Sequence, residues 1–244
     1  YSKNEIILSN FNINQINIDK FYSILNRRIL NEPISKIINT KSFWKDNFYV
    51  NKFVLDPRPE TECIIEEAIK IYNNKKTHFK ILDIGTGSGA LAISLAREFE
   101  NAEILAVDIS KDAIKVANKN IREKKLDKQI SVKKTTFENI DDEFDLIVSN
   151  PPYLTLTEMK NISDEIRKFE PEIALYGGDD GLDFYREFAL KIDTKLTNTG
   201  YFICEIGASQ FDACMEIFNE SGLKFIKKSQ DLQKKDRIMS FSKI

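Results

Sequence analysis

Hydrophobic positions from residue 79 onward follow two alternating patterns. Short runs rich in Val, Ile and Leu are separated by longer segments whose apolar residues recur at helical spacing. The runs predict strands at 79–84, 103–108, 130–134, 144–149, 200–206, 223–228 and 237–242. The longer segments predict helices between most of these strands, at about 88–98, 110–124, 182–196 and 208–221.

Strands joined through helices indicate right-handed crossovers and a mainly parallel sheet that is covered on both faces. The predicted fold class is therefore α/β, with a doubly wound, mainly parallel seven-stranded sheet. In such sheets ligands bind at the carboxyl ends of the strands, near the switch in strand order. We expect chemistry from the residues that directly follow each strand.

The first part of the chain has a different pattern. Residues 18–31 place apolar side chains at helical spacing and predict a small N-terminal helical piece. Aromatic and β-branched residues then flank residues 45–47 and predict a β-hairpin, which ends at Pro57 and Pro59. A helix with an apolar face follows from residue 60. We expect three parts: a short helical region over 1–41, a hairpin linker over 42–56 and the main domain over 57–244.

Composition narrows the class of protein. Of 244 residues, 42% are hydrophobic and 30% are charged, which is typical of a globular chain and excludes disorder and fibrous folds. No apolar run approaches the roughly 18 residues of a membrane helix, and residues 1–5 do not begin a signal peptide, so we expect a soluble protein. The chain begins with Tyr1 rather than Met, as expected of a fragment or a processed chain.

Metal chemistry has no support in the sequence. Cys63, Cys204 and Cys214 form no CxxC pair and are too scattered for a zinc cluster or a disulfide framework, so we expect buried thiols that act as small hydrophobes. The single histidine, His78, follows the polar stretch 73–77, where a solvated loop is expected. No metal site is predicted.

The formal net charge of −2 gives no general attraction to polyanions. Residues 1–55 carry 8 basic and 4 acidic groups, whereas the remainder carries 28 and 34. This asymmetry suits a contact surface near the N-terminus, although a solvated helical face explains it more simply.

A glycine-rich loop joins the first strand of the sheet to its helix. Its sequence is Asp83-Ile84-Gly85-Thr86-Gly87-Ser88-Gly89-Ala90. Glycines let the backbone turn tightly and approach a ligand, and the helix N-terminus offers unpaired N–H groups. The loop therefore predicts a small cofactor site. The same residues also fit the G-x-G-x-x-A pattern of dinucleotide-binding folds, so the loop alone does not identify the cofactor.

The second strand ends in Asp108, about 20 residues further on. A carboxylate there can accept hydrogen bonds from both hydroxyls of a ribose, and the adjacent Ile109 can lie against a base. The alternative role for Asp108 is a favourable charge at the N-terminus of the following helix. Together with the glycine loop, Asp108 favours a nucleoside-containing cofactor.

The fourth strand ends in Asn150-Pro151-Pro152-Tyr153. Two consecutive prolines cannot donate to a ladder, so the chain must leave the sheet there with free carbonyl groups. The Asn150 side-chain oxygen and the Pro151 main-chain carbonyl can form a pair of acceptors for a planar NH2 group, and Tyr153 adds an aromatic face. Such a site would hold an amide or aromatic amine with its nitrogen aimed at an electrophile.

The glycine loop, the acid after the second strand and Asn-Pro-Pro-Tyr together resemble Rossmann-like class I S-adenosylmethionine-dependent methyltransferases. That superfamily contains nucleic-acid adenine and protein glutamine methyltransferases, so the tetrapeptide alone leaves both open. Over about residues 24–244 the chain is similar to the HemK/PrmC family, which methylates the glutamine of the Gly-Gly-Gln motif in class I peptide chain release factors. The similar segments are 43–44, 48–50, 57–62, 169–175, 177–183, 205–207 with Gln210, and 236–237.

The resemblance implies a protein-glutamine methyltransferase that uses S-adenosylmethionine, releases S-adenosylhomocysteine and acts in the cytoplasm on a release factor. It implies catalytic roles for Asn150, Pro151, Pro152 and Tyr153. It implies cofactor contacts from Asp83, Gly85, Thr86, Gly87, Ser88, Gly89, Asp108, Ile109, Phe137 and Asn150. Residues 1–41 would dock the substrate, and no nucleic acid, membrane or metal partner is expected.

The chain departs from the family pattern in three places. Its N-terminal helical region is shorter. Thr136-Phe137 replaces the usual acid and Trp after the third strand, so Phe137 keeps a ring to stack on adenine while Thr136 offers the base edge only a hydroxyl. The glycine that commonly precedes the final arginine is missing before Arg237.

An amide nitrogen is a weak nucleophile because its lone pair is delocalised. Acceptors at Asn150 and Pro151 would fix both N–H groups and aim the nitrogen, a positioning effect worth on the order of 7 to 11 kcal/mol. No general base is required before attack, because methylation itself makes the nitrogen acidic. Residues 154–180 contain few clear elements and are interpreted as a lid or partner-binding loop, or else as a plain surface excursion.

Three alternatives stay open at this point. A ribosomal-protein glutamine methyltransferase would share the same chemistry. A nucleic-acid adenine methyltransferase shares Asn-Pro-Pro-Tyr, but it would need a basic groove that the net charge does not favour. A binding module or NAD-dependent dehydrogenase would require the prolines to be incidental.

Overall fold

The computed structural model describes residues 17–73 and 78–244. The helices are α2 (Ile18–Ile29), α3 (Ile34–Ile38), α4 (Glu62–Ile71), α5 (Ala90–Glu98), α6 (Lys111–Glu123), α7 (Leu156–Asn161), α8 (Asp164–Phe169), α9 (Asp183–Lys191) and α10 (Phe211–Phe218). Single 3-10 turns are η2 (Pro59–Thr61), η3 (Phe137–Asn139), η4 (Glu172–Ala174) and η5 (Ile192–Lys195). The strands are β1 (Thr40–Phe43), β2 (Asp46–Tyr49), β3 (Lys80–Ile84), β4 (Glu103–Asp108), β5 (Ile130–Lys134), β6 (Phe144–Ser149), β7 (Leu196–Glu205), β8 (Leu223–Gln230) and β9 (Asp236–Lys243).

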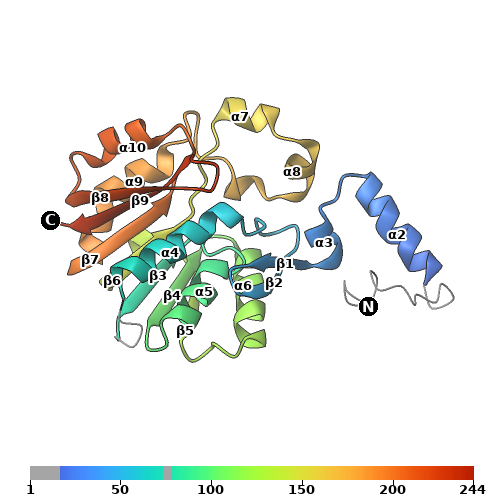
Figure 1. Cartoon of the computed structure of the whole chain (residues 1–244), viewed down its shortest axis with the longest axis horizontal. Helices are drawn as coiled ribbons and strands as arrows, with labels where there is room; N and C mark the ends of the chain where they lie inside the picture. The colour runs from blue at the N-terminus through green and yellow to red at the C-terminus, as the bar shows by residue number, and fades with distance from the viewer. Residues whose placement is uncertain (1–16, 74–77) are drawn as a thin grey trace.

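A seven-stranded sheet forms the centre of the molecule, in the order β5-β4-β3-β6-β7-β9-β8 (Figure 1). Strands β3 to β7 pair in parallel, whereas β9 pairs antiparallel with both β7 and β8. The predicted doubly wound, mainly parallel sheet is therefore confirmed. The strand order reverses between β3 and β6, and this is where ligands bind in open α/β sheets.

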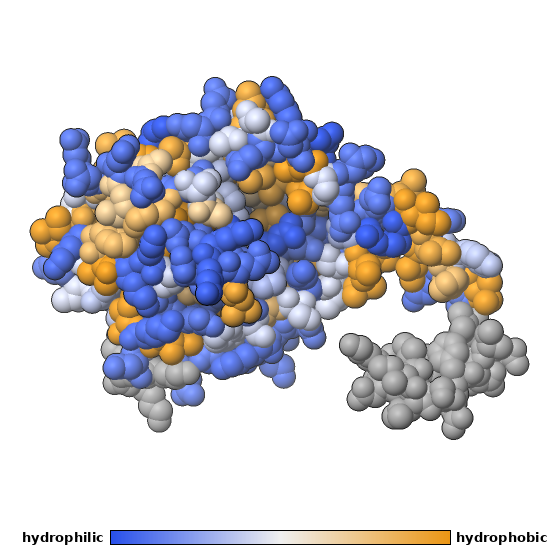
Figure 2. Space-filling view, turned by 45° about the horizontal axis from the view of Figure 1, so that its top comes forward, coloured by the Kyte–Doolittle hydropathy of each residue, from blue (hydrophilic) through white to orange (hydrophobic). Residues whose placement is uncertain are grey.

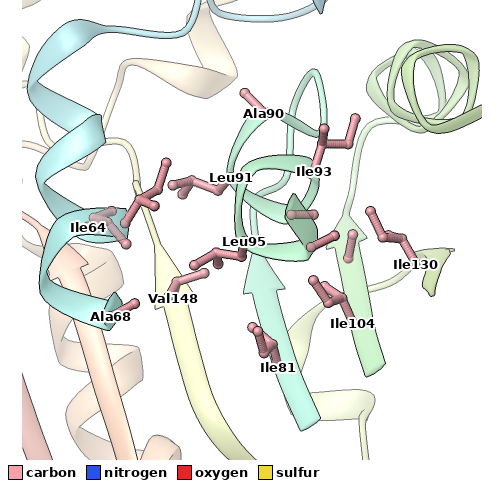
Figure 3. Packing of buried hydrophobic residues seen from close by; sticks show 14 of the residues in the cluster. Ile64, Ala68, Ile81, Ala90, Leu91, Ile93, Leu95, Ile104, Ile130 and Val148 are labelled. Carbon is pink, nitrogen blue, oxygen red and sulfur yellow. The ribbon is translucent and has the colours of Figure 1, made fainter. Parts of the chain in front are cut away.

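Helices cover both faces of the sheet because its buried strands carry apolar side chains on both faces. On one face, α4, α5 and α6 pack against alternate residues such as Ile81, Ile104 and Val148. Figure 3 shows side chains of α4 and α5 packed on that side of the sheet. On the other face, α9 and α10 pack against the intervening residues, among them Leu82 and Phe202.

The β1–β2 hairpin shares the first of these cores. Phe43, Phe48 and Val50 are buried in it, and the Asn120 side chain of α6 bonds the Tyr49 backbone through both its oxygen and its nitrogen. The hairpin is shorter than predicted, because β2 ends at Tyr49 and residues 53–55 form a loop. The division into three parts stays a prediction, and residues 1–16 of the first part lie outside the described residues.

Helix α2 forms where the helical period predicted it, but none of its residues is buried. The Asn17 side chain caps it by accepting from the Lys20 backbone N–H. Large apolar side chains on or beside it are exposed, including Phe21, Tyr22 and Ile29. Helix α2 lies to one side of the sheet in Figure 1, and Figure 2 shows apolar side chains gathered there.

Two of the three predicted buried thiols, Cys204 and Cys214, are buried. Cys63 is only half-buried. The His78 side chain is exposed as expected, although residues 74–77 before it lie outside the described residues. Across residues 17–73 and 78–244, no helix is long and apolar enough to cross a membrane. The same residues hold no cluster of three or more His, Cys, Asp or Glu side chains arranged for a metal ion.

Candidate active site

A cavity of about 370 Å³ lies at the carboxyl ends of β3, β4 and β6. That volume is within the range of small-molecule sites. Its lining combines the predicted loops with residues from the hairpin, η2, η4 and α9. Of the predicted site residues, it includes Gly85, Thr86, Gly87, Ser88, Asp108, Ile109, Phe137, Asn150 and Pro152. The structure thus brings together motifs that lie up to 67 positions apart in the chain, because β3 pairs with both β4 and β6.

The glycine loop opens toward this cavity. Gly85 and Gly87 have φ values of +73° and +54°, a region that residues with a Cβ rarely adopt. A Cβ at Gly85 would meet no atom within 4 Å, so the backbone there borders open space rather than packed protein. Helix α5 begins at Ala90, two residues later than predicted, and its N-terminus follows the loop directly.

Asp83 lies beneath the loop and is not part of the cavity lining. Its Oδ2 accepts from the Thr86 hydroxyl at 2.6 Å and from the Ala92 backbone N–H at 3.2 Å. Its Oδ1 has no hydrogen-bond partner. Burial raises the pKa of this carboxyl to about 7. The geometry gives Asp83 an indirect part, which is to hold the loop through Thr86.

Asp108 reaches the cavity from the end of β4. Its Oδ2 accepts from the Gly87 backbone N–H at 2.9 Å and its Oδ1 from the Ser110 N–H at 2.8 Å. Burial raises the pKa of its carboxyl. The Ile109 backbone N–H also bonds this carboxyl, and because a carboxylate has about four acceptor positions, about one is left for a ligand hydroxyl. The neighbouring Ile109 is exposed and lines the cavity, where it offers an apolar surface.

Phe137 follows β5 and forms another wall. It is buried and packs edge-on against Phe188 of α9, with ring centroids 5.4 Å apart. The adjacent Thr136 hydroxyl accepts from the Asn139 side-chain amide at 3.0 Å. Its hydrogen bond to Glu138 helps lower the pKa of that carboxyl, although burial opposes the shift. Phe137 is thus placed for stacking, while the Thr136 hydroxyl already has protein partners.

Asn150 lines the cavity at the end of β6, next to the glycine loop because Ser149 pairs with Ile84 of β3. Its Nδ2 donates to the Thr61 hydroxyl at 2.9 Å. No described residue donates to its Oδ1, which leaves that oxygen as an acceptor for a ligand. Pro151 is buried and is not part of the lining, so the expected pairing of its carbonyl with the Asn150 oxygen stays a prediction.

Tyr153 supports the site from behind. Its hydroxyl donates to Glu205 at 3.1 Å, and burial raises the pKa of the phenol. Its backbone carbonyl accepts from the side-chain amide of Gln210. Gln210 also bonds the carbonyl of Gly181 and the N–H of Gly207, and it thereby joins three loops. Tyr153 and Gly89 are, like Asp83 and Pro151, absent from the lining.

Sequence reasoning missed several members of the site. Thr61, Glu205 and Gln210 all lie in segments that resemble the family, but no role followed from the pattern. The signal that could have found Glu205 is its charge directly after the apolar run at residues 201–204. The hairpin region also contributes cavity walls, such as Phe43 and Phe53, and no sequence pattern placed these residues at the site.

Residues 154–180 hold more structure than predicted. They form α7, α8 and η4, and a bridge between Leu154 and Tyr176 closes the base of the excursion. Pro171, Ile173 and Ala174 from this segment line the cavity. The segment therefore covers part of the site, which favours the lid interpretation over a plain surface excursion.

A buried ion cluster ties this lid to the N-terminal region. The Lys36 ammonium of α3 lies 2.7 Å from Asp56 and 3.0 Å from Glu170 at the end of α8. It also donates to the carbonyls of Asn51 and Val54. Arg58 adds a second contact to Glu170 at 3.2 Å. Asp56 lines the cavity, so the cluster joins the cavity wall to the lid segment at the end of α8.

The chain is similar to known methyltransferases. The model of the methyltransferase small domain family matches residues 68–168. The bifunctional methyltransferase of Rickettsia typhi is 38% identical over 258 residues, covering 98% of this chain and 50% of that protein. The release factor glutamine methyltransferase of Caulobacter vibrioides is 38% identical over 217 residues, covering 88% of this chain and 75% of that protein.

The solved structure of a ribosomal protein L11 methylase from Lactobacillus delbrueckii subsp. bulgaricus has a TM-score of 0.55 to this chain. It is 20% identical, and the match covers 76% of this chain and 80% of that one. At this identity the match supports the fold alone. The chain spans about half the length of the bifunctional relatives that it matches.

Proposed function

This chain belongs to the release factor glutamine methyltransferase family, and we propose that it transfers a methyl group to the side-chain amide nitrogen of a release factor glutamine. The observation that carries the proposal is one cavity lined by the glycine loop, by Asp108 and by Asn150. An acceptor for an amide group therefore lies in the same space as a nucleoside-binding loop. The proposed target is the glutamine of the Gly-Gly-Gln motif.

The lining fits S-adenosylmethionine. The Asp108 carboxylate keeps an acceptor position for a ribose hydroxyl, and open space lies beside Gly85 where a Cβ would stand. Ile109 and Phe137 offer apolar surfaces for a purine. When bound, this cofactor supplies an electrophilic methyl group on a sulfonium. Asp83 and Thr86 keep the loop in place beneath it.

Asn150 is the residue proposed to hold the substrate glutamine amide. Its Oδ1 accepts one N–H of the glutamine amide, and the Pro151 carbonyl is proposed to accept the other. Fixing both N–H groups aims the nitrogen lone pair at the methyl group, and such positioning is worth on the order of 7 to 11 kcal/mol in favourable cases. The product nitrogen then loses its extra proton to solvent, so no side chain needs to act as a base.

The family supports a release factor as the protein substrate, and we also propose a cytoplasmic location, where translation takes place. The apolar side chains of α2 and the lid over residues 154–180 are the proposed docking surfaces, because both lie outside the buried cores. No role is proposed for a nucleic acid, a membrane or a metal.

Labelled methyl transfer tests the proposal. The chain is incubated with radiolabelled S-adenosylmethionine and a release factor, or with the same factor whose Gly-Gly-Gln glutamine is changed to alanine. We expect label only on the first. Equal labelling of both factors would reject the assignment, and labelling of a ribosomal protein or of nucleic acid instead would replace it.

Two variants separate catalysis from cofactor binding. In Asn150→Ala we expect kcat to fall about 100-fold or more, with cofactor affinity nearly unchanged, because positioning is lost. In Asp108→Ala we expect cofactor affinity to fall at least about tenfold, because hydrogen bonds to a charged group are lost. Calorimetry measures affinity and initial rates measure kcat. Thermal melting of both variants controls for misfolding. The reverse pattern would contradict the assigned roles.

A further inference from the structure

Three segments that lie far apart in the sequence meet behind Asn150 through a series of hydrogen bonds. The Asn150 Nδ2 donates to the Thr61 hydroxyl at 2.9 Å, and this hydroxyl donates to the Glu205 Oε2 at 2.6 Å. The other Glu205 oxygen accepts from the Tyr153 hydroxyl at 3.1 Å. Thr61 and Glu205 are 4% and 1% exposed, so water does not compete for these bonds.

Glu205 determines which groups donate and which accept in this series of hydrogen bonds. An ionised carboxylate has no proton and can only accept, so the single Thr61 hydroxyl proton is committed to it. The Thr61 oxygen is then available only as an acceptor. Of the two ends of the Asn150 amide, only the NH2 group can satisfy an acceptor. The amide is therefore fixed with its nitrogen toward Thr61 and its oxygen free for the cavity.

We propose that Thr61 and Glu205 are positioning residues for the proposed methyl transfer: they orient the Asn150 side chain so that its carbonyl oxygen faces the glutamine amide. Neither residue needs to touch the reacting atoms. A reversed Asn150 amide would present NH2 to the substrate NH2, which it could not hold. The catalytic consequence of this inference rests on the proposed function. The orientation of the Asn150 amide can be measured without a release factor substrate.

Several charged and polar groups surround the Glu205 carboxyl. Arg237 of β9 favours its ionised form, whereas Glu60 of η2 disfavours it. Cys63 of α4 also interacts with its charge, and the Tyr185 hydroxyl of α9 bonds its backbone carbonyl rather than its side chain. Burial is the largest influence and raises the pKa of Glu205 to about 7.

Protonation of Glu205 would remove the constraint. A neutral carboxyl group carries a proton that it can donate to Thr61, and Thr61 can then donate its own proton to the Asn150 oxygen. The reversed amide becomes possible, so productive orientation is lost as the pH falls through about 7. In Glu205→Gln the Tyr153 hydroxyl can donate to the amide oxygen, which leaves the NH2 group facing Thr61, so the constraint is lost at every pH and this position cannot titrate.

Steady-state kinetics over pH 5.5 to 9 test the catalytic consequence. We expect Thr61→Val to lower kcat about 100-fold with the KM for the cofactor unchanged, and Thr61→Ser to restore it. We expect Glu205→Gln to lower kcat above pH 8 to the level that the unmodified chain has below pH 6.5, and to show no change in kcat near pH 7. Tyr185→Phe is the matched control: it removes a buried hydrogen bond to the same residue, but from its backbone, and should leave the pH profile unchanged.

Nuclear magnetic resonance tests the orientation directly. In the full chain with S-adenosylhomocysteine, the Asn150 side-chain NH2 signal is assigned by its loss in Asn150→Asp. We expect this signal to titrate near pH 7 in the unmodified chain and to be independent of pH in Glu205→Gln. An Asn150 signal that is insensitive to Thr61→Val and to pH would overturn the inference. A titrating signal in a chain that methylates no release factor would overturn the proposed function and leave the orientation standing.

Discussion

Replacing Lys36 by methionine isolates the cluster that joins the lid to the cavity wall. The Lys36 side chain is 2% exposed and lies between two carboxylates, Asp56 at 5% and Glu170 at 3%. Methionine keeps most of the volume and removes only the charge and its hydrogen bonds. Two buried carboxylates would then face each other, and their remaining partners include Arg58, Ser35 and the Asp56 backbone N–H.

The expected cost follows from this burial. Removing one partner of a buried ion pair costs about 3 to 5 kcal/mol, because the remaining charge stays desolvated. An exposed pair contributes about 0 to 1 kcal/mol. Lys115→Met is the matched control, since Lys115 lies 2.6 Å from Asp112 on the surface of α6. We therefore expect Lys36→Met to lose about 3 to 5 kcal/mol of unfolding free energy and Lys115→Met to lose at most about 1 kcal/mol.

The unfolding free energy lost in Lys36→Met should also become smaller as the pH falls. Burial raises the pKa of Glu170, and the Lys36 charge opposes that shift. Without Lys36 the pKa of Glu170 rises further, so the folded variant binds a proton more readily than its unfolded chain, and the defect shrinks as the pH falls. Urea unfolding at pH 5 and pH 8 measures both effects. Equal losses for the two variants, or a defect in Lys36→Met that is the same at both pH values, would refute this account.

Two further predictions concern the glycine loop. Gly85→Ala should weaken S-adenosylhomocysteine binding about tenfold or more by calorimetry, because alanine strains a backbone at φ +73° and its methyl group occupies the open space beside the loop; unchanged affinity would show that no ligand lies there. Burial raises the pKa of Asp83 to about 7 from an ordinary value of 3.8, so the folded state binds more protons between these limits and its stability should fall as the pH rises through that window. Asp83→Asn should flatten this trend in melting temperature between pH 5 and pH 8, and an unflattened trend would assign the pH dependence to other groups such as Glu205.

The sheet could be predicted from the sequence because its signals are local. Strands such as Lys80–Ile84 and Phe144–Ser149 are apolar on both faces, and a run of that kind has few alternatives in a chain of alternating helices. The short helices α3, α7 and α8 were not predicted. Each has only five or six residues, so neither a full apolar period nor a long capping pattern can develop.

The meeting of Gly85, Asp108 and Asn150 at one cavity was also predictable, since each follows a strand whose end must meet the others at one edge. The residues that support the site from other segments could not be predicted from the sequence. Thr61 matters because of its contact with Glu205, 144 positions away, and no local pattern encodes such a contact. Asp83 shows the reverse case: the motif indicated a cofactor ligand, and the structure places the side chain beneath the loop, bonded to Thr86.

The position of Glu205 on β7 has a consequence for the order of synthesis. Every residue of the cavity lining lies at or before Glu187, so a nascent chain that has reached the end of α9 already carries the whole lining. Glu205 is made later, and β7 becomes an interior strand only when β9 pairs with it. A growing polypeptide therefore contains every residue of the cavity lining before it contains Glu205, so the proposed orientation of Asn150 becomes possible only after β7 has been made.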